Sequence, residues 1–226
     1  MISHKYKCIF IHIPKCAGTS IESALGHFNG CAERVEQDHR TLRMIEKPLL
    51  TPNVFLSIEN FLYIQRRIRY KFQSHKNPHN ALTATKEQYA NYFKFTFIRN
   101  PWARAYSWYK NVMRDEIHKN DHKISGPLSF KEFLQKFAGR GMLAPQVNWL
   151  KDFSNSIPLD YIGRFENLDT DFKKICNLLK IEPIILPHKQ QGSGSDYRKE
   201  YDEESIYLIK KIYWEEIELF NYSFED

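Results

Sequence analysis

The stretch YKCIFIHIPKCAGTSIESALGHF, residues 6–28, decides the fold. Its first part, residues 6–13, is short, apolar and rich in isoleucine, which is typical of a buried β-strand. A turn containing proline and glycine follows, and Ile21, Leu25 and Phe28 then recur at the spacing of one helix face. The stretch therefore predicts a strand, a loop and a helix in direct succession.

The same succession occurs twice more along the chain. Residues 94–98 (KFTFI) predict a strand, and the helix-like segment 101–113 follows directly with proline at its first position. Residues 160–165 (DYIGRF) predict a weaker strand before the helix-like segment 166–181. Repeated strand–turn–helix units favour an α/β fold with a central parallel sheet flanked by helices.

Two further segments predict amphipathic helices. Residues 202–220 carry acidic residues at their start, where the helix dipole favours them, followed by an apolar stripe. Residues 55–72 form the second helix, which bears a run of positive charge. The run is interpreted either as a solvated helix face or as the lining of a groove for an anionic substrate. Its members are Arg66, Arg67, Arg69 and Lys71.

Length and composition set the class of protein. The 226 residues include 42% hydrophobic and 15% aromatic residues, enough for the core of one domain over 1–226, and they exclude a disordered chain. The longest apolar run near the start, Cys8 to Ile11, is too short for a membrane span. Because the first strand begins by Tyr6, we expect no signal peptide and no integral membrane segment.

Charge and cysteine content add two expectations. The formal net charge of +6 suits an anionic ligand such as a nucleotide, a glycan or nucleic acid, but it equally fits simple solubility. The four cysteines have neither the spacing of a zinc site nor that of a disulfide framework. We therefore expect free thiols and a cytoplasmic location.

The loop PKCAGTS at residues 14–20 has the chemistry of a phosphate-binding loop. Small residues let the backbone approach a ligand, Lys15 adds a point charge, and Thr19 and Ser20 add hydroxyl donors. The loop does not match a Walker A motif, because its lysine precedes Gly18 instead of following the last glycine. Taken alone, it is also compatible with a plain strand-to-helix turn.

A second motif, RNPWARAYSWY at residues 99–109, follows the second predicted strand. Arg99 stands at the strand end, where ligands bind in open α/β sheets, and Ser107 lies about two helical turns further on. An arginine fork with a hydroxyl suits a second phosphate, and Arg104 adds charge. The alternative is that both arginines form structural ion pairs.

Together the two motifs resemble those of sulfotransferases that use 3'-phosphoadenosine 5'-phosphosulfate (PAPS), and more narrowly the carbohydrate sulfotransferases of sulfotransferase family 2. In that family the first motif binds the 5'-phosphosulfate and the second binds the 3'-phosphate. The resemblance continues through residues 145–150, 162–168 and the C-terminal FNYSFED. It implies that the donor is bound by Lys15, Cys16, Ala17, Gly18, Thr19, Ser20, Arg99, Arg104 and Ser107.

The resemblance also implies a fold and a domain plan. The family has a P-loop NTPase-like three-layer fold, with a central parallel sheet flanked by helices. We therefore expect a single sulfotransferase domain over residues 1–226. Residues 48–82 do not match the family pattern and are expected to be a helical insert.

The implied reaction is in-line transfer of a sulfuryl group from PAPS to a hydroxyl of a carbohydrate acceptor. Lys15 would neutralise the leaving nucleotide, and Cys16, where relatives often have threonine, would act through its backbone N–H. His39 is the first candidate for the general base that takes the acceptor proton. His12 is its rival, unless it is a packed core histidine, and Glu22 is a further possibility.

No metal is expected in this scheme. His118 and His122 are four residues apart, but the sequence offers no evident third ligand. The adenosine end is assigned to residues 190–198, with Ser195 and Tyr197 as contacts in a mobile lid, although a plain linker fits equally well.

The acceptor candidates come from several parts of the chain. An indole stacks on sugar faces and an amide binds hydroxyls, so Trp149 and Gln146 fit a carbohydrate, although core packing explains Trp149 equally well. The residues assigned to the acceptor are His12, Arg43, Gln146 and Trp149, with Asn148 beside them.

Two other classes of function compete with this interpretation. A P-loop-like kinase or phosphotransferase is disfavoured by the position of Lys15 and by the lack of a clear magnesium-binding aspartate after a strand. A non-catalytic module that binds anions or nucleic acid through residues 66–71 is the second alternative. We expect a carbohydrate partner and no nucleic acid, and the sequence makes no prediction of oligomeric state.

Overall fold

The computed structural model describes residues 1–31, 36–46, 54–55, 57–187 and 196–226. Its internal contacts divide the chain into two compact units, each built from separated segments. Unit 1 consists of Met1–Ile13, Ala17–Ile98 and Asn148–Lys189, and unit 2 of Pro14–Cys16, Arg99–Val147 and Gln190–Asp226. The single domain expected from the sequence stays a prediction.

Unit 1 contains a four-stranded, mostly parallel sheet in the order β1-β2-β3-β4. The strands are β1 (Ile2–Ser3), β2 (Cys8–Ile11), β3 (Phe93–Ile98) and β4 (Tyr161–Arg164). The last three match the three predicted strands, and β2–β3 and β3–β4 pair in parallel. The sheet is not wholly parallel as predicted, because a tight turn after β1 returns the chain and pairs β1 antiparallel with β2.

Burial explains why these runs form strands. Every residue of β2 is buried, and only Phe93 of β3 is partly exposed. β2 is continuously apolar, as strands covered on both faces are, whereas β3 carries Lys94 and Thr96 between its apolar residues. In the β2–β3 register Ile11 pairs with Thr96, whose Oγ1 donates to the Ile11 carbonyl at 2.8 Å. The segments that follow β2 and β3 therefore start from the same edge of the sheet.

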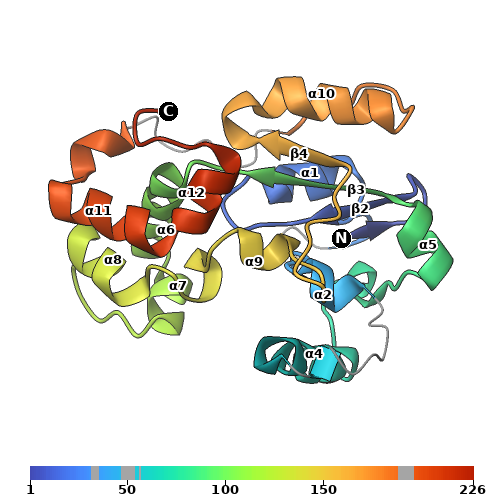
Figure 1. The fold of residues 1–226 in the computed structure, drawn as a ribbon, viewed down its shortest axis with the longest axis horizontal. Helices are drawn as coiled ribbons and strands as arrows, with labels where there is room; N and C mark the ends of the chain where they lie inside the picture. The colour runs from blue at the N-terminus through green and yellow to red at the C-terminus, as the bar shows by residue number, and fades with distance from the viewer. Residues whose placement is uncertain (32–35, 47–53, 56, 188–195) are drawn as a thin grey trace. The chain divides into compact units, whose positions relative to one another are not determined.

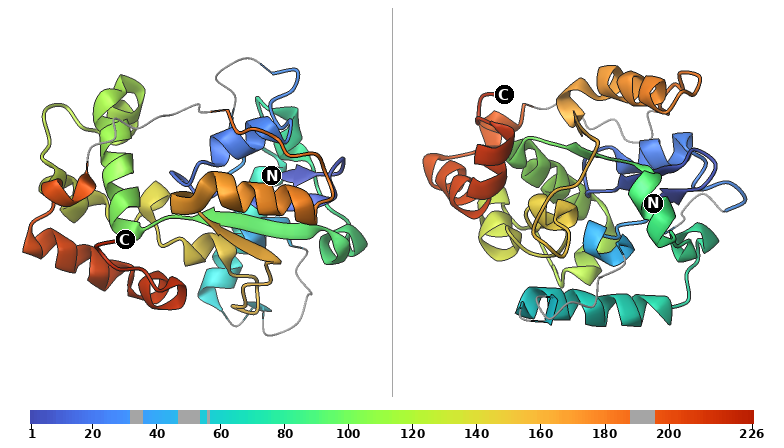
Figure 2. Two further views of the ribbon diagram at one scale, coloured as in Figure 1. Left: turned by 90° about the horizontal axis from the view of Figure 1, so that it is seen from above. Right: turned by 45° about the vertical axis from the view of Figure 1, so that its right-hand side comes forward.

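Helices lie on both sides of this sheet. Within unit 1, α1 (Gly18–Ala24) and α10 (Leu168–Leu178) lie on one side, and α2 (Leu42–Ile45) and α4 (Ile58–Lys71) lie on the other (Figures 1 and 2). Unit 1 also contains the short α5 (Lys86–Asn91). The observed architecture is thus mixed α/β, as predicted.

The predicted helix over 55–72 is confirmed as α4. It begins at Ser57, whose side chain accepts the Asn60 N–H. The rest of the predicted insert includes the 3₁₀ turn η1 (Pro78–Ala81), while residues 48–53 and 56 lie outside the described residues. In the described part of the chain, no helix is both long and apolar enough to cross a bilayer.

Unit 2 is helical. Its helices are α6 (Pro101–Arg114), α7 (Glu116–Asp121), α8 (Phe130–Phe137), α11 (Glu203–Ile212) and α12 (Trp214–Phe220), and α9 (Val147–Leu150) begins at its boundary. α6 begins where predicted, because Asn100 Oδ1 accepts the N–H groups of Trp102 and Ala103. α6, α8 and α11 pack around one apolar core that includes Trp102, Phe133 and Ile209.

The predicted single helix over 202–220 is two helices, α11 and α12, which meet at Tyr213. This residue is 1% exposed, and its hydroxyl donates to the Leu143 carbonyl at 2.5 Å and accepts the Gly139 N–H at 2.9 Å. These contacts with a distant loop fix Tyr213 in a non-helical conformation. The predicted apolar stripe is nevertheless the buried one, since Ile209 and Ile217 belong to the same core.

Candidate functional site

The predicted site residues fall into two groups, one in each unit, and each group is described by itself. The loop 14–20 contributes to both, because Pro14–Cys16 belongs to unit 2 and the residues from Ala17 onward belong to unit 1. The group in unit 2 contains Lys15, Cys16, Arg99, Arg104, Ser107, Gln146 and Tyr197. The group in unit 1 contains His12, Ala17, Gly18, Thr19, Ser20, His39, Arg43 and Trp149.

Lys15 and Arg99 are direct neighbours in unit 2. Arg99 Nη1 donates to the Lys15 carbonyl at 3.2 Å, and Lys15 Nζ donates to Asn111 Oδ1 at 3.3 Å. Arg99 follows β3 directly, and Asn111 lies in the second half of α6. The structure therefore brings together the two cations that the sequence assigned to two separate motifs.

One face of α6 collects further polar groups beside Lys15. Arg104, Ser107, Asn111 and Arg114 are spaced by three, four and three residues, so they share one helix face. Ser107 lies one turn before Asn111, which Lys15 contacts. The sequence analysis missed Asn111 and Arg114, although their spacing from Ser107 was a usable signal.

The Lys15 ammonium lies in an unfavourable environment for a cation. Burial, and then the positive charges of Arg99 and Arg114, lower the pKa of Lys15 to about 8. A bound anion would oppose both effects, since it would replace lost hydration and offset the neighbouring cations. The arrangement is suited to binding a phosphate or a sulfate group.

Arg104 supports the loop from within the protein. It is 1% exposed, and its guanidinium donates to the carbonyls of Pro14 at 3.1 Å, Ala144 at 3.1 Å and Met142 at 2.7 Å. These bonds fix the start of the PKCAGTS loop. We therefore assign Arg104 a positioning role in place of the donor contact expected from the sequence.

Gln146 is also a positioning residue, contrary to its expected contact with the acceptor. Its side chain is fully buried, and its Oε1 accepts the Arg99 N–H at 2.9 Å and the Cys16 thiol at 3.4 Å. Its Nε2 donates to the Arg99 carbonyl at 2.8 Å and to Glu216 Oε1 at 2.9 Å. The Gln146 amide therefore makes its hydrogen bonds within the protein. These bonds hold in place the segment that carries Arg99 and, through Cys16, the segment that carries Lys15.

Glu216, which the sequence analysis missed, completes this support. It is fully buried, and burial raises its pKa to about 7, while the nearby Arg104 cation opposes that rise. Its Oε2 accepts the Gln146 backbone N–H. Glu216 thereby links α12 to the segment that orients Arg99.

His39 and His12 lie side by side in unit 1, with ring centroids 4.3 Å apart. His39 Nδ1 lies 3.3 Å from the His12 carbonyl, which can only accept, so the proton is on Nδ1 and the lone pair is on Nε2. Burial, and then the neighbouring His12, lower the pKa of His39 to about 4. His39 is therefore neutral at pH 7, as a general base must be.

His12 is enclosed by the protein and contacts Glu22. It is 2% exposed, its Nδ1 lies 3.1 Å from Glu22 Oε1, and burial lowers its pKa to about 3. Burial also raises the pKa of Glu22 to about 7, and its Oε1 accepts the Asp38 N–H at 3.1 Å. This burial matches the packed-histidine alternative for His12, so it does not contact an acceptor here.

The geometry of the loop depends on the small size of Gly18 and on the left-handed backbone of Lys15 and Ala17. A Cβ on Gly18 would lie 1.9 Å from His12 Cδ2, so only glycine fits beside this ring. Ala17 and Lys15 both adopt the left-handed region, with φ of 61° and 69°. For residues with a Cβ this conformation costs about 1–2 kcal/mol each, and such strain concentrates at functional sites.

Arg43 and Trp149 are internal residues, not surface contacts for an acceptor. Arg43 is fully buried and donates to the Asp152 carbonyl at 2.9 Å and to Asn155 Oδ1 at 2.5 Å. Trp149 is only 7% exposed, which matches its core-packing alternative. Thr19 and Ser20, in contrast, are partly exposed in the first turn of α1.

Of the two expected adenosine contacts, the structure describes one. The Tyr197 hydroxyl donates within unit 2 to the carbonyls of Phe224 at 2.7 Å and Asp226 at 3.0 Å. These bonds tie Tyr197 to the C-terminal residues. Ser195 lies outside the described residues, and its predicted role stays a prediction.

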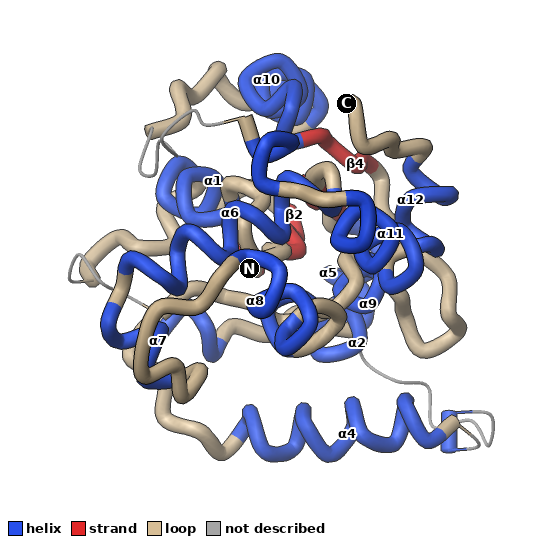
Figure 3. The backbone as a smooth tube through the Cα atoms, turned by 90° about the vertical axis from the view of Figure 1, so that its left-hand side faces the viewer, coloured by secondary structure: helices blue, strands red, loops and turns tan. Residues whose placement is uncertain are grey.

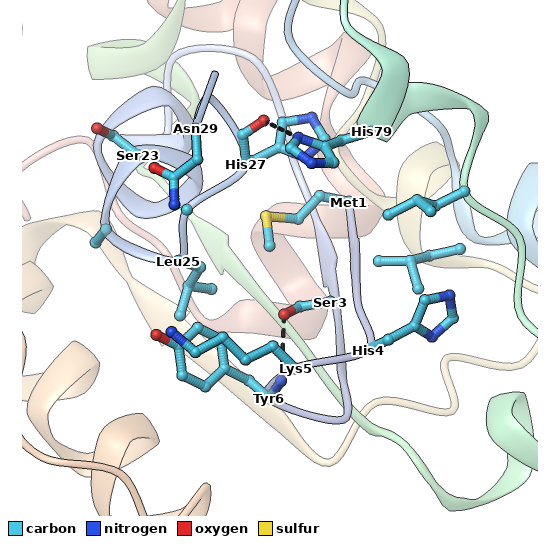
Figure 4. Close-up of a pocket in the computed structure, with 14 residues that line it drawn as sticks. Met1, Ser3, His4, Lys5, Tyr6, Ser23, Leu25, His27, Asn29 and His79 are labelled. Atoms are coloured by element: carbon cyan, nitrogen blue, oxygen red, sulfur yellow. Dashed lines mark hydrogen bonds between the residues drawn. The ribbon is translucent and has the colours of Figure 1, made fainter. Parts of the chain in front are cut away.

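A pocket of about 410 Å³ lies at a different place in unit 1 (Figure 4). It is lined by β1 and the turn after it, by Ser23, Leu25 and His27 around the carboxyl end of α1, and by His79. The phosphate-type loop precedes α1, and ligands of parallel sheets bind beyond the carboxyl ends of the strands. The pocket in Figure 4 is therefore not the candidate reaction site.

In the part of the chain that the structure describes, no group of three or more histidine, cysteine, aspartate or glutamate side chains could hold a metal ion. His122 Nδ1 donates to the His118 carbonyl at 2.8 Å, which gives this histidine pair a structural contact.

Comparison with known proteins identifies the family. A model of the sulfotransferase family matches residues 1–223, so the chain belongs to the sulfotransferase family. Carbohydrate sulfotransferase 14 of Mus musculus is 22% identical over 209 aligned residues, covering 82% of this chain, and that of Homo sapiens is 21% identical over the same length. An uncharacterized protein of Archaeoglobus fulgidus is 26% identical over 125 residues, covering 50% of this chain and 89% of that protein.

The chain spans 47% of the length of the two carbohydrate sulfotransferases it matches. No solved structure matches the chain. Membership of this family supports a transferase that moves a sulfuryl group. It does not identify the donor or the acceptor.

Proposed function

We propose that the chain is a PAPS-dependent sulfotransferase that transfers the sulfuryl group to a hydroxyl of a carbohydrate. Membership of the sulfotransferase family supports the reaction class. The relatives named carbohydrate sulfotransferase 14 support the acceptor class. The two cation-bearing motifs support a donor with phosphate groups at both ends.

The observation that carries the proposal is the junction of these motifs in unit 2. Arg99 donates to the Lys15 carbonyl, and the Lys15 ammonium contacts Asn111 one turn from Ser107. Two cations thus lie close together in unit 2, one helical turn from the Ser107 hydroxyl, which supports a site for the anionic groups of PAPS. The lowered pKa of Lys15 is further support, because an anion there would relieve the unfavourable charge.

The proposed roles follow from the chemistry of each side chain. The Lys15 ammonium would neutralise the charge that develops on the bridging oxygen as the nucleotide leaves. Arg99 and Ser107 would bind the 3'-phosphate, with the arginine fork as the main contact. Thr19 and Ser20 would donate hydroxyl hydrogen bonds to the phosphosulfate end. Arg104 and Gln146 would hold these groups in place.

His39 is the proposed general base. Its proton on Nδ1 is held by the His12 carbonyl, so its Nε2 can accept the proton of the acceptor hydroxyl. Neutrality at pH 7 supports this role. The arrangement resembles other bases whose ring is oriented by a hydrogen bond to the second nitrogen.

Two finer statements remain proposals as well. The order β2, loop, α1 around a mostly parallel sheet supports a P-loop-like three-layer fold. The cytoplasmic location predicted from the sequence stays a prediction.

The direct test is a transfer assay with labelled PAPS and a panel of glycans, run with EDTA present. We expect transfer to at least one glycan, retained in EDTA and lost in Lys15→Ala. Lys210→Ala, which changes an exposed lysine of α11, is the control and should retain activity. Transfer of phosphate from ATP that requires magnesium, with no transfer from PAPS, would identify a phosphotransferase instead.

A further inference from the structure

Helix α4 carries its apolar face outward. Five large apolar side chains on or directly after it are about half exposed or more: Ile58 81%, Phe61 47%, Leu62 56%, Ile68 56% and Phe72 81%. At 100° per residue these positions fall on one continuous arc of the helix. Gln65 and Arg69 also lie within this arc, and Arg66 lies at its edge. We call these eight residues the outer face of α4.

Polar contacts fix this orientation on the opposite side of the helix. Asn60 is 4% exposed, and its Nδ2 donates to the Phe153 carbonyl at 3.0 Å. The Tyr63 hydroxyl donates to the Asn148 carbonyl at 3.3 Å. Arg67 donates to the Glu46 carbonyl. α4 is thus attached to unit 1 by its polar residues, whereas an ordinary surface helix buries its apolar stripe.

The position of α4 leaves this face outside the unit that holds it. Within unit 1, α2 lies between α4 and the sheet (Figures 1 and 3). A contiguous exposed apolar face of this kind marks an interaction surface, because single scattered apolar residues are what an ordinary surface shows. A partner that covers this face needs an apolar surface for its five apolar side chains.

The charged residues of α4 indicate which kind of partner would cover its outer face. The acidic Glu59 of α4 is paired with Arg43, whereas Arg66 and Arg69 flank the apolar side chains with positive charge. A second copy of the chain, meeting this face with the same face, would bring four arginines into one apolar interface, and neither outer face carries an acidic side chain to pair with them. A bilayer with anionic headgroups offers hydrocarbon for the apolar side chains and phosphates for the arginines.

We propose that the outer face of α4 binds the surface of a membrane that contains anionic phospholipids. The helix has 14 residues and is about 21 Å long, too short to span the hydrocarbon core, so it would lie in the plane of the interface. The proposal goes beyond the transfer reaction and does not depend on it. A catalytically inactive protein would bind the same membrane.

The test is sedimentation of the full chain with phosphatidylcholine vesicles, with and without about 30 mol% phosphatidylserine. We expect the chain to bind the anionic vesicles, and to bind them roughly tenfold more weakly after either of two double substitutions. One is Phe61→Ser with Leu62→Ser, which removes apolar contacts. The other is Arg66→Glu with Arg69→Glu, which reverses the charge.

Matched controls change exposed residues elsewhere. Trp214→Ser removes an apolar side chain that is 63% exposed, and Lys210→Glu with Lys211→Glu reverses two exposed charges of α11. Both controls should bind anionic vesicles like the unaltered chain, and circular dichroism should be unchanged in every variant. Equal binding of the α4 variants and the controls would overturn the proposal. So would a dimer, seen by sedimentation velocity without lipid, that only the α4 substitutions dissociate.

Discussion

Lys15 combines three features that rarely occur together in a surface lysine. It adopts a left-handed backbone conformation, it contacts a side chain of α6, and its pKa is lowered to about 8 by burial and by neighbouring cations. The backbone conformation and the lowered pKa are both unfavourable to the folded protein, and an anion beside the ammonium would offset the second. Residues under such strain are typical of sites where binding repays it.

Replacing Lys15 by methionine should separate activity from stability. Transfer should fall by roughly 10²–10³-fold, because charge on the leaving nucleotide is no longer neutralised. The melting temperature should rise, because the lowered pKa means that the ammonium destabilises the fold at every pH below about 8. Activity and thermal melting of the variant and of Lys210→Met give the comparison. A lower melting temperature with normal turnover would contradict both parts.

The pH dependence of kcat/KM should reflect the titration of Lys15 and of His39. The Lys15 ammonium is lost above about pH 8, and His39 becomes protonated only near pH 4. The value of kcat/KM for the free enzyme should therefore be level through pH 6–7 and fall about tenfold per unit above pH 8. An acid limb centred near 6.5, the ordinary histidine value, would contradict the lowered pKa of His39 and not its role as the base.

Removal of the His39 side chain should affect chemistry more than binding. His39→Ala should lower kcat by roughly 10²–10⁴-fold, the usual contribution of a general base, with nucleotide affinity retained. His118→Ala, which changes a histidine of α7, is the control. If both variants turn over normally, the base is another group.

At the scale of elements, the loop before α1 and the strand it follows depend on each other. The ring of His12 occupies the space where a Cβ on residue 18 would lie. The same histidine holds the proton of His39 through its carbonyl. The loop conformation and the orientation of His39 are therefore coupled within unit 1.

The substitution Gly18→Ala should disturb both the conformation of the loop and the orientation of His39. A Cβ at 1.9 Å from the His12 ring forces either the loop or the ring to move, at a cost of about 1–3 kcal/mol in unfolding free energy. Gly126→Ala is the matched control, because no atom lies within 4 Å of its added Cβ. Denaturant unfolding measures both variants. Equal stability of the two would show that the contact at Gly18 is not restrictive.

Several elements could be predicted from the sequence because their signals are local. The apolar runs predicted β2, β3 and β4, and Pro101 marked the start of α6. The break at Tyr213 could not be predicted, because it depends on contacts with Gly139 and Leu143, more than sixty residues away.

The candidate site divides in the same way. Lys15 and Arg99 were recognisable from motif chemistry, and in the structure the Arg99 guanidinium donates to the Lys15 carbonyl. The positioning roles of Arg104 and Gln146 could not be recognised from the sequence. They depend on the burial of these side chains, and the type of a residue does not tell whether it is buried. Glu216 was missed because nothing in an acidic helix distinguishes its one buried carboxylate.

The chain in its entirety belongs to the sulfotransferase family over residues 1–223 and carries a formal net charge of +6. The contacts divide it into two units, and the predicted donor loop contributes residues to both. The positive groups around Lys15 and Arg99 are the feature of unit 2 that a doubly anionic nucleotide would satisfy.

Arg99 and Lys15 are proposed to bind one nucleotide that has phosphates at both ends. Calorimetry with 3'-phosphoadenosine 5'-phosphate in EDTA measures this binding, with AMP as the ligand that lacks the 3'-phosphate. We predict that the unaltered chain binds the bisphosphate well and AMP poorly, and that Arg99→Ala lowers affinity for the bisphosphate by about 100-fold, as expected for a charged contact. Equal affinity of the chain for both nucleotides, or unchanged affinity in Arg99→Ala, would contradict the account.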